Sequence, residues 1–276
     1  MGKAAGVKQT AIAICLGLCA LTAACSRPPP KNAAAQGPVN AQGTAPQSDY
    51  AQPPELQTAR REAQDMVALI GISRPDAMIR LASPDGGAIG AKASHDGAWT
   101  LTVPGGPAPR LYSLSEDQPG QPLRARGYVA ALPAPGAPAA ILRPGASVDS
   151  LGAAAAGLTI TGVDFDHSGV GVASGRAKPG EVVRITLDGT EVGEDTTSPE
   201  GVFAVPLSQS LHGGAHVLSA QSRSGAASAA FRADATAPLL KPGFLATRER
   251  DAWRIDWTTP GGGVQTSIIF DPKAPA

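Results

Sequence analysis

Residues 178–189 read KPGEVVRITLDG, and their pattern of polar and apolar residues predicts the fold class. Val183, Ile185 and Leu187 alternate with polar or charged residues, and this period of two places one side of a β-strand in a core and the other in water. A Pro-Gly turn precedes the strand, and the Asp-Gly pair after it supplies the positive φ that tight hairpins need. The segment therefore predicts a strand of an antiparallel sheet with a turn at each end.

The chain repeats this pattern at an offset of about 104 residues. Residues 74–86 read RPDAMIRLASPDG, with the same order of turn, strand and Asp-Gly pair. Residues 96–99 (DGAW) recur as residues 200–203 (EGVF). An internal duplication of this length predicts two copies of one supersecondary unit. In the second copy, Pro206 cannot donate to a ladder, so it predicts an edge strand or a bulge.

The second copy carries a series of motifs at residues 174–185 (SGRAKPGEVVRI), 188–189 (DG), 200–203 (EGVF) and 214–218 (GAHVL). This series resembles a bacterial Ig-like domain and is most similar to those found beside LysM peptidoglycan-binding modules in envelope proteins. The resemblance covers residues 160–233 well and residues 67–130 weakly, where Asp76 replaces the turn glycine. It implies a two-sheet sandwich whose matching residues are structural, and it implies no catalytic residue.

We therefore expect an all-β chain with two Ig-like β-sandwich domains in tandem, at residues 55–131 and 158–234. Residues 132–157 are rich in Pro, Gly and Ala and are expected to form a linker. Residues 235–276 contain two alternating runs around a Gly-rich turn, which predict a C-terminal β-hairpin. Residues 55–66 fit either a short helix or a distorted first strand.

The first 24 residues have the layout of a signal peptide. Lys3 and Lys8 form a basic start, no acidic residue is present, and an apolar run over residues 11–24 follows. The run is shorter than the ~20 residues that a membrane-spanning helix needs. We expect residues 1–24 to be removed on export.

The apolar run ends in LTAACS, residues 21–26. This hexapeptide resembles the lipobox of bacterial lipoproteins, with Thr22 where Leu is commonest. The resemblance implies cleavage between Ala24 and Cys25 and acylation of Cys25, palmitate included, which would anchor the chain on a membrane. Ser26 resembles the outer-membrane sorting residue of enteric bacteria. The implied location is therefore the bacterial cell envelope, on the outer membrane facing the periplasm.

Residues 25–54 are expected to form a disordered tether after the lipidated cysteine. The segment has few aliphatic side chains and cannot bury enough apolar surface to fold. Its prolines are Pro28, Pro29, Pro30, Pro38, Pro46, Pro53 and Pro54. The tether is either a stalk that lifts the domains off the membrane or a tail without a mechanical purpose.

Composition excludes several classes of function. The 23 basic and 23 acidic residues cancel, and aromatic residues make up only 4% of the chain. Nucleic-acid binding needs a basic face and stacking aromatics, so we expect no nucleic-acid partner. Cys15, Cys19 and Cys25 all lie at or before the expected cleavage site, so the mature chain can form no internal disulfide.

Motifs for catalysis and metal binding are weak. The four histidines are scattered, and His212 and His216 flank a Gly-Gly turn instead of sharing a helix face. Asp164 and Asp166 imitate the start of a calcium loop, but the position that needs a bidentate Glu is Gly175. The alternative is a hairpin turn stabilised by an Asp side chain. We expect no metal, no cofactor and no enzymatic activity.

Trp253 and Trp257 are the candidate ligand-binding residues, because they lie with Ile255 on one face of the expected hairpin. That face is either core or a docking patch for a sugar or a protein. The preferred hypothesis is a non-enzymatic envelope lipoprotein, anchored at Cys25, that presents its Ig-like modules to an unknown periplasmic protein or to peptidoglycan. The alternative is a glycan- or peptidoglycan-binding adhesion protein that uses the tryptophan face. A third hypothesis is an enzyme whose site is assembled from dispersed residues.

Overall fold

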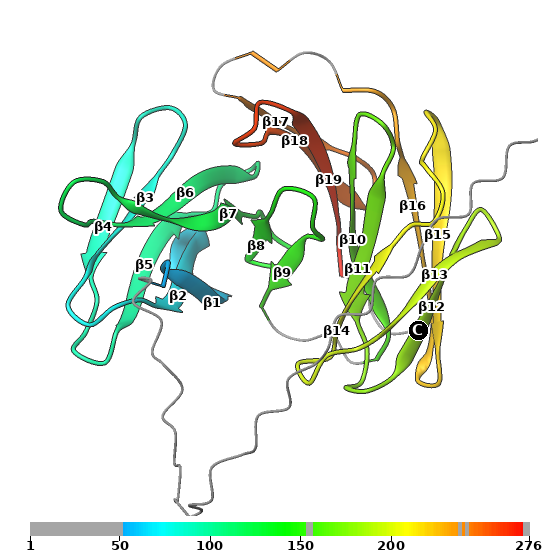
Figure 1. Cartoon of the computed structure of the whole chain (residues 1–276), viewed down its shortest axis with the longest axis horizontal. Helices are drawn as coiled ribbons and strands as arrows, with labels where there is room; N and C mark the ends of the chain where they lie inside the picture. Colours follow the sequence, from blue (N-terminus) through cyan, green and yellow to red (C-terminus); the bar gives the residue numbers. More distant parts are fainter. Residues whose placement is uncertain (1–51, 153–156, 237–238, 241–242, 273–276) are drawn as a thin grey trace, which may run out of the picture. The chain divides into compact units, whose positions relative to one another are not determined.

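A computed structural model describes residues 52–152, 157–236, 239–240 and 243–272, all of which belong to the compact unit Asp49–Ala276. These residues contain no α-helix and are organised into antiparallel sheets (Figure 1). The chain is all-β, as the alternating patterns predict. The signal peptide, Cys25 and the tether up to residue 51 lie outside the described residues.

The first repeat is a sandwich of two sheets. One sheet has the order β1-β2-β5, with β1 (Glu55–Arg61), β2 (Met66–Ile72) and β5 (Ala98–Pro104). The other begins β4-β3-β6-β7, with β4 (Ala88–Lys92), β3 (Met78–Ala82), β6 (Arg110–Glu116) and β7 (Leu123–Ala131). Residues 55–61 are thus a strand, with a register shift between Leu56 and Thr58, and a short 3-10 turn, η1 (Ala63–Asp65), connects it to β2.

The second repeat has the same strand order. Its sheets contain β14-β11-β10 and β13-β12-β15-β16. The bounds are β10 (Thr159–Asp166), β11 (Gly171–Arg176), β12 (Val182–Leu187), β13 (Thr190–Thr196), β14 (Val202–Pro206), β15 (Ala215–Ser222) and β16 (Gly225–Arg232). The equivalent order confirms that the duplication seen in the sequence is a duplication of one sandwich. Pro206 ends the edge strand β14, as its missing N–H predicts.

Two segments outside the repeats are also strands. The segment 132–157, expected to be a linker, contains β8 (Ala139–Leu142) and β9 (Asp149–Leu151), which extend the sheet of the first repeat past β7. The C-terminal segment contains the expected hairpin as β18 (Ala252–Thr258) and β19 (Val264–Phe270), with β17 (Phe244–Arg248) as an additional strand. These three strands extend the sheet of the second repeat past β10. The expected C-terminal hairpin is therefore present with one strand more than predicted, and the expected linker contains two strands that were not predicted.

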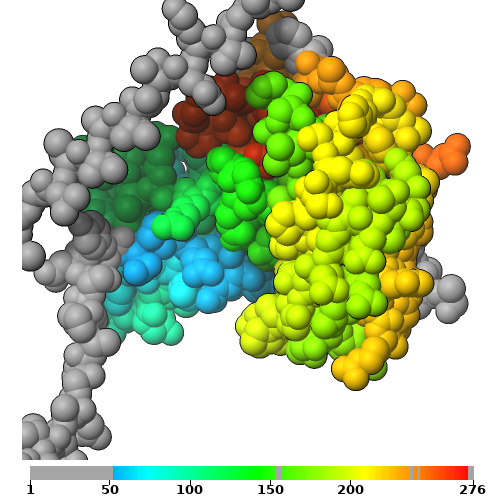
Figure 2. Space-filling model, turned by 45° about the vertical axis from the view of Figure 1, so that its right-hand side comes forward, coloured from blue at the N-terminus to red at the C-terminus, as the bar shows by residue number. Residues whose placement is uncertain are grey.

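The strands that extend the two sheets form a third hydrophobic core between them. The cores of the first and second repeats are separate clusters, and a further cluster, which we call the central core, joins β6, β7 and β8 to β18 and β19. Its buried members are Leu111, Ala130, Leu132, Ala140, Leu142, Val148, Ile255, Trp257 and Ile269. In the space-filling view the red C-terminal strands border the first repeat (Figure 2). The central core therefore packs the two repeats against each other.

Two turns that the sequence predicts have backbone angles in the left-handed region. Asp188 and Gly189 connect β12 to β13 with φ of 51° and 84°, which is the pair of positive values that a tight hairpin requires. Asp76, which replaces the turn glycine in the first repeat, also has a positive φ of 60°. Its carboxylate pairs with Lys92 and His95 and thus links the turn to β4 and the following loop.

A pair of glycines marks the same close approach in both repeats. Gly71 lies opposite Trp99 in the β2–β5 pair, and Gly175 lies opposite Phe203 in the β11–β14 pair. A Cβ at Gly175 would lie 2.4 Å from the Phe203 ring and 2.1 Å from the Thr159 carbonyl oxygen. The backbone atoms cannot move aside easily, so both glycines make room for the aromatic side chain that anchors each core.

Gly175→Ala is expected to destabilise the chain by about 1–3 kcal/mol, because the added methyl group overpacks this contact. Denaturant unfolding of the two proteins measures the difference. Gly213→Ala is the matched control, since a Cβ at Gly213 meets no atom within 4 Å. Equal unfolding midpoints for the Gly175 and Gly213 variants would show that the contact can relax.

Candidate functional site

The structure separates the two candidate tryptophans. Both lie on β18 and on the same face, as the alternation predicts. Trp257 is completely buried in the central core, where its Nε1 donates to Ser267 Oγ at 3.1 Å and its ring meets Tyr128 edge-on at 5.6 Å. Its indole offers no surface to a ligand, which corrects the expectation that both tryptophans could bind one. Trp253 is half-buried, because it lies where this face leaves the core.

Trp253 lines an open cavity of about 560 Å³, a volume within the range of small-ligand sites. The other residues around the cavity come from distant parts of the chain. They are Asp65, Gly106 and Pro107 from two loops of the first repeat, Pro133 and Ala134 from the β7–β8 loop, and Arg248 at the end of β17. The cavity exists because the central core brings the C-terminal strands to these loops. We call it the Trp253 cavity.

The wall from the β1–β2 turn is held in a strained conformation. Gln64 and Asp65 are consecutive non-glycine residues with φ of 61° and 55°. The Asp65 carbonyl accepts a hydrogen bond from the Gly105 N–H at 2.7 Å, and its carboxylate accepts one from the Gly106 N–H at 2.7 Å. Left-handed non-glycine residues persist only where the surroundings fix them, and they gather at functional sites.

The wall from the β7–β8 loop is fixed by Arg61. This guanidinium, at the end of β1, donates to four main-chain carbonyls of the loop, those of Leu132 at 3.1 Å, Pro133 at 2.7 Å, Gly136 at 2.9 Å and Ala137 at 3.4 Å. A planar donor fork suits such a cluster of acceptors. Arg61 thereby sets the position of Pro133 and Ala134 in the cavity wall.

Arg248 forms the opposite wall beside Trp253, its cross-strand partner in the β17–β18 pair. Its guanidinium lies over the indole, 5.4 Å from the ring centroid. Asp271 holds the guanidinium by two hydrogen bonds, and this pairing raises the pKa of Arg248 above its ordinary value. The residues that line the cavity are thus held in place by contacts outside it.

Sequence reasoning identified Trp253 but missed its neighbours. Arg248 could have been found as the residue opposite Trp253 across a short β-turn, had β17 been recognised as a strand. Asp65, Pro107 and Pro133 carry no motif, since only the packing of the two extended sheets brings them to Trp253. Their positions depend on contacts between distant segments, which a local pattern does not encode.

A second polar cluster lies inside the contact between the repeats. The Asp164 carboxylate, on β10, accepts hydrogen bonds from the Val148 N–H and the Ser267 hydroxyl. Gln265 reaches across the same contact, accepting from the Gly145 N–H at 2.9 Å and donating to the Arg143 carbonyl at 3.3 Å. Burial raises the pKa of Asp164 to about 7, although its hydrogen bonds act in the opposite direction. These contacts tie the 143–148 loop to β10 and β19.

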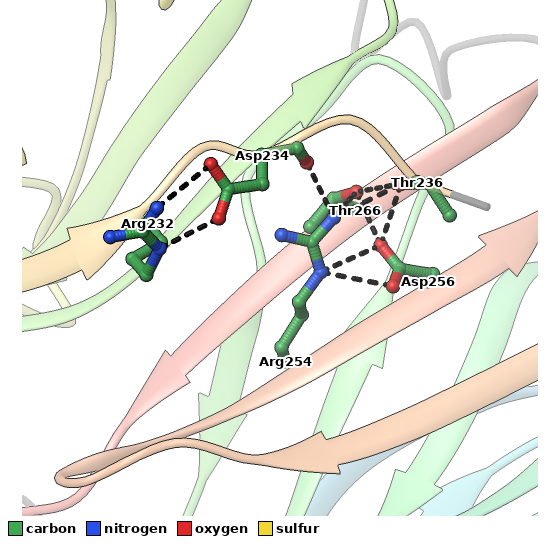
Figure 3. A network of polar contacts seen from close by, with 6 residues as sticks. All are labelled: Arg232, Asp234, Thr236, Arg254, Asp256 and Thr266. Carbon is green, nitrogen blue, oxygen red and sulfur yellow. Dashed lines mark hydrogen bonds and ion pairs between the residues drawn. The ribbon is translucent and has the colours of Figure 1, made fainter. Parts of the chain in front are cut away.

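A third cluster joins the end of β16 to the C-terminal strands (Figure 3). Arg254 and Asp256, both buried, form an ion pair with Nε 2.9 Å from Oδ2. Thr236 and Thr266 donate to the Asp256 carboxylate, and Arg254 donates to the Asp234 carbonyl at 2.8 Å. Both charged groups therefore have hydrogen-bond partners besides each other, which offsets part of the cost of burying them. This cluster fixes the segment after β16 on β18 and β19.

The remaining sequence candidates have local roles. Asp166 accepts hydrogen bonds from the N–H groups of Ser168 and Val170, so this segment is the Asp-stabilised turn that was the alternative to a calcium loop. His216 contacts the Asp188 carboxylate and the His212 carbonyl, each at 2.7 Å. Within the described ranges, no three His, Cys, Asp or Glu residues are grouped so that they could hold a metal ion. Cys25 and Ala24 lie outside these ranges.

The chain can be compared with known proteins by sequence and by structure. No family model and no curated protein matches the chain. Among solved structures it is similar to the BSP domain of a biofilm-associated protein, at 15% identity over 67% of this chain and 30% of that one, with a TM-score of 0.22. This chain thus spans about 30% of that protein's length.

Two further structures are similar to the chain. One is the central fibronectin-III array of RIM-binding protein, at 13% identity over 80% of this chain and 90% of that one, with a TM-score of 0.26. The other is a structure of a bacterial ice-binding adhesin, at 15% identity over 74% and 79%, with a TM-score of 0.21. With scores this low, the Ig-like assignment rests on the strand order of the two repeats. In the described part of the chain, no helix is long and apolar enough to cross a membrane.

Proposed function

We propose that this chain is a non-enzymatic lipoprotein of the bacterial cell envelope, anchored through Cys25 and acting as a binding module. The observation that carries the binding role is the Trp253 cavity, whose walls come from the first repeat, the β7–β8 loop and the C-terminal strands and are fixed by Arg61, Asp65 and Asp271. A site held in its bound geometry loses little conformational freedom on binding. The lipobox-like segment supports the anchor, and the proline-rich tether supports a module held away from the membrane.

Cys25→Ser is expected to release the chain from membranes. Three acyl chains contribute ~0.8 kcal/mol per buried CH₂ group, which is enough to hold a protein on a membrane. Fractionation of cells that produce the full chain measures the distribution between membrane and soluble fractions. Cys19→Ser, inside the expected leader, is the matched control and should stay membrane-bound. An unchanged distribution of the Cys25 variant would contradict lipidation.

The binding role can be tested in cells by site-specific photo-crosslinking. A photo-reactive amino acid at Pro107, which lines the cavity, should give an adduct with a partner protein or with peptidoglycan. The same amino acid at Thr190, an exposed residue of β13 in the second repeat, is the control and should give none. Adducts at both positions, or at neither, would contradict a partner that binds at the cavity.

A further inference from the structure

We propose that the Trp253 cavity binds neutral carbohydrate. The ligand class is a sugar ring that presents an apolar C–H face and several uncharged hydroxyl groups. This inference rests on the proposed binding function and adds the chemistry of the ligand. Three features of the cavity favour such a ligand: its charge, its free hydrogen-bonding atoms and its apolar walls.

The two charged side chains that line the cavity, Asp65 and Arg248, have opposite signs, which disfavours a strongly ionic ligand. Asp65 contributes one negative charge, and the positive charge of Arg248 is paired with Asp271, with Nη1 3.1 Å from Oδ1. A phosphate or a polyanion would bring negative charge toward both carboxylates, and only an already paired guanidinium would oppose them. A strongly cationic ligand would meet Arg248. A neutral ligand avoids both costs.

The hydrogen-bonding atoms left free suit hydroxyl groups. Asp65 uses Oδ2 for the Gly106 N–H, and its Oδ1 accepts no hydrogen bond from the described residues. Arg248 uses its two Nη groups for Asp271 and the Arg250 carbonyl, and its Nε makes no hydrogen bond within the same ranges. Asp65 Oδ1 thus remains as an acceptor, and Arg248 Nε and Trp253 Nε1, for which no hydrogen bond is formed within the described ranges, remain as donors. A hydroxyl group both donates and accepts, whereas a polyproline segment offers no donor to Asp65.

The remaining walls are apolar. The indole of Trp253 and the rings of Pro107 and Pro133 provide rigid surfaces that lose little side-chain entropy when they are covered. A sugar ring has C–H groups on its faces and hydroxyls at its rim, so it can cover the indole while its rim reaches Asp65 and Arg248. The combination of apolar walls with a few oriented polar groups is typical of small-molecule sites.

The proposal can be tested by titrating the full chain, extracted in mild detergent, with the β-1,4-linked tetramer of N-acetylglucosamine as a neutral probe. A tetramer of galacturonic acid and a ten-residue polyproline peptide are the comparison probes. Calorimetry measures affinity, and tryptophan emission locates the site, because Trp99 and Trp257 are 3% and 0% exposed and only Trp253 can be covered. We expect the neutral sugar to bind and to shift the emission.

Three variants distinguish this site from other surfaces. Trp253→Ala and Asp65→Asn should each weaken neutral-sugar binding at least tenfold, and Trp253→Tyr, which keeps a ring, should weaken it less than Trp253→Ala. Leu245→Ala is the matched control, because Leu245 is exposed on β17 beside Trp253's strand but does not line the cavity. The affinity of this variant for the neutral sugar should equal that of the unmodified chain. Asn at position 65 can still accept from the Gly106 N–H, so the turn should keep its fold.

The remaining outcomes would overturn the proposal. They are binding only of the anionic sugar or the peptide, neutral-sugar binding that survives Trp253→Ala, and no binding at all. A chain that ignores every sugar but fractionates with membranes and crosslinks through position 107 would keep the proposed function and lose only the carbohydrate assignment. A chain that binds the neutral sugar but stays soluble would lose the anchor and keep the site.

Discussion

Asp164→Asn is expected to remove a pH dependence from the stability of this protein. The free energy of unfolding of the unmodified chain should fall by about 2–4 kcal/mol between pH 4.5 and 7.5, while that of the variant should change by less than about 1 kcal/mol. The cause is the carboxyl group of Asp164, which is 2% exposed and lies in the contact between the two repeats. Burial raises its pKa from 3.8 to about 7.

The free energy of unfolding falls with rising pH because the folded chain binds a proton that the unfolded chain releases. The folded pKa lies above the unfolded one, so between pH 4 and 7 the folded chain keeps a proton on Asp164 that the unfolded chain releases. The stability from this proton is complete below pH 4 and is lost as the pH rises through about 7. At 1.36 kcal/mol per pKa unit, the whole effect is about 4 kcal/mol. Asn resembles the protonated acid, because its Oδ1 can accept from the Val148 N–H and its Nδ2 can donate to Ser267.

Denaturant unfolding at several pH values measures this difference.

His216 also contributes to the pH dependence of stability and needs a separate control. Burial opposes its charge, but the His212 carbonyl and Asp188 outweigh burial and raise the pKa of His216, so its contribution is also lost as the pH rises. The His216→Gln variant therefore serves as a second background for Asp164→Asn. Equal pH profiles with Asp and Asn at position 164 would show that this carboxyl group is ionised in the folded chain.

Trp257→Ala is expected to lower the free energy of unfolding by about 3–5 kcal/mol, the usual cost of removing a large aromatic side chain from a core. Trp257 is fully buried between the two repeats, and its removal also takes a hydrogen-bond donor from Ser267. The substitution removes apolar packing from the central core, which holds the two repeats together. We therefore also expect the unfolding transition to broaden, because the two repeats would unfold less cooperatively. Thermal and denaturant unfolding measure both effects.

Trp253→Ala is the matched control for this prediction, because the same residue type on the same strand is replaced outside the core. We expect it to cost less than about 1 kcal/mol, in keeping with its half-buried position. Trp257→Phe should lie in between, since it keeps most of the apolar volume and loses the bond to Ser267. If both alanine variants unfold at the same denaturant concentration, the central core does not hold the repeats together.

Most of the fold could be predicted from local patterns. The alternation at Val183, Ile185 and Leu187 appears in the structure as alternating burial along β12, and the duplication appears as one strand order used twice. Strand β8 was missed because Ala139–Leu142 is buried on both faces, so it shows no alternation, and the prolines on either side indicate a loop. Strand β17 is short and has a mixed burial pattern, which gives an equally weak signal.

The candidate site could be predicted only in part, for a related reason. The alternation along β18 correctly puts Trp253 and Trp257 on one face. Whether each ring meets core or solvent depends on where β7 and β8 end, and these strands are distant from β18 in the sequence. The raised pKa of Asp164 has the same origin, because the 143–148 loop that helps to bury it follows the first repeat and connects β8 to β9 in another sheet.

The central core also determines when, during synthesis, the chain can finish folding. Gln265 meets Arg143 across a separation of 122 residues, so the apolar side chains of β7 and β8 gain their cover only after the intervening segment exists. At roughly 5–20 residues per second, a ribosome needs roughly 6–25 s for that distance. During this interval Leu132 and Leu142 present uncovered apolar surface, which is a condition that promotes aggregation. Chains interrupted before β18 should therefore be substrates for chaperones and proteases, even though the first repeat is complete.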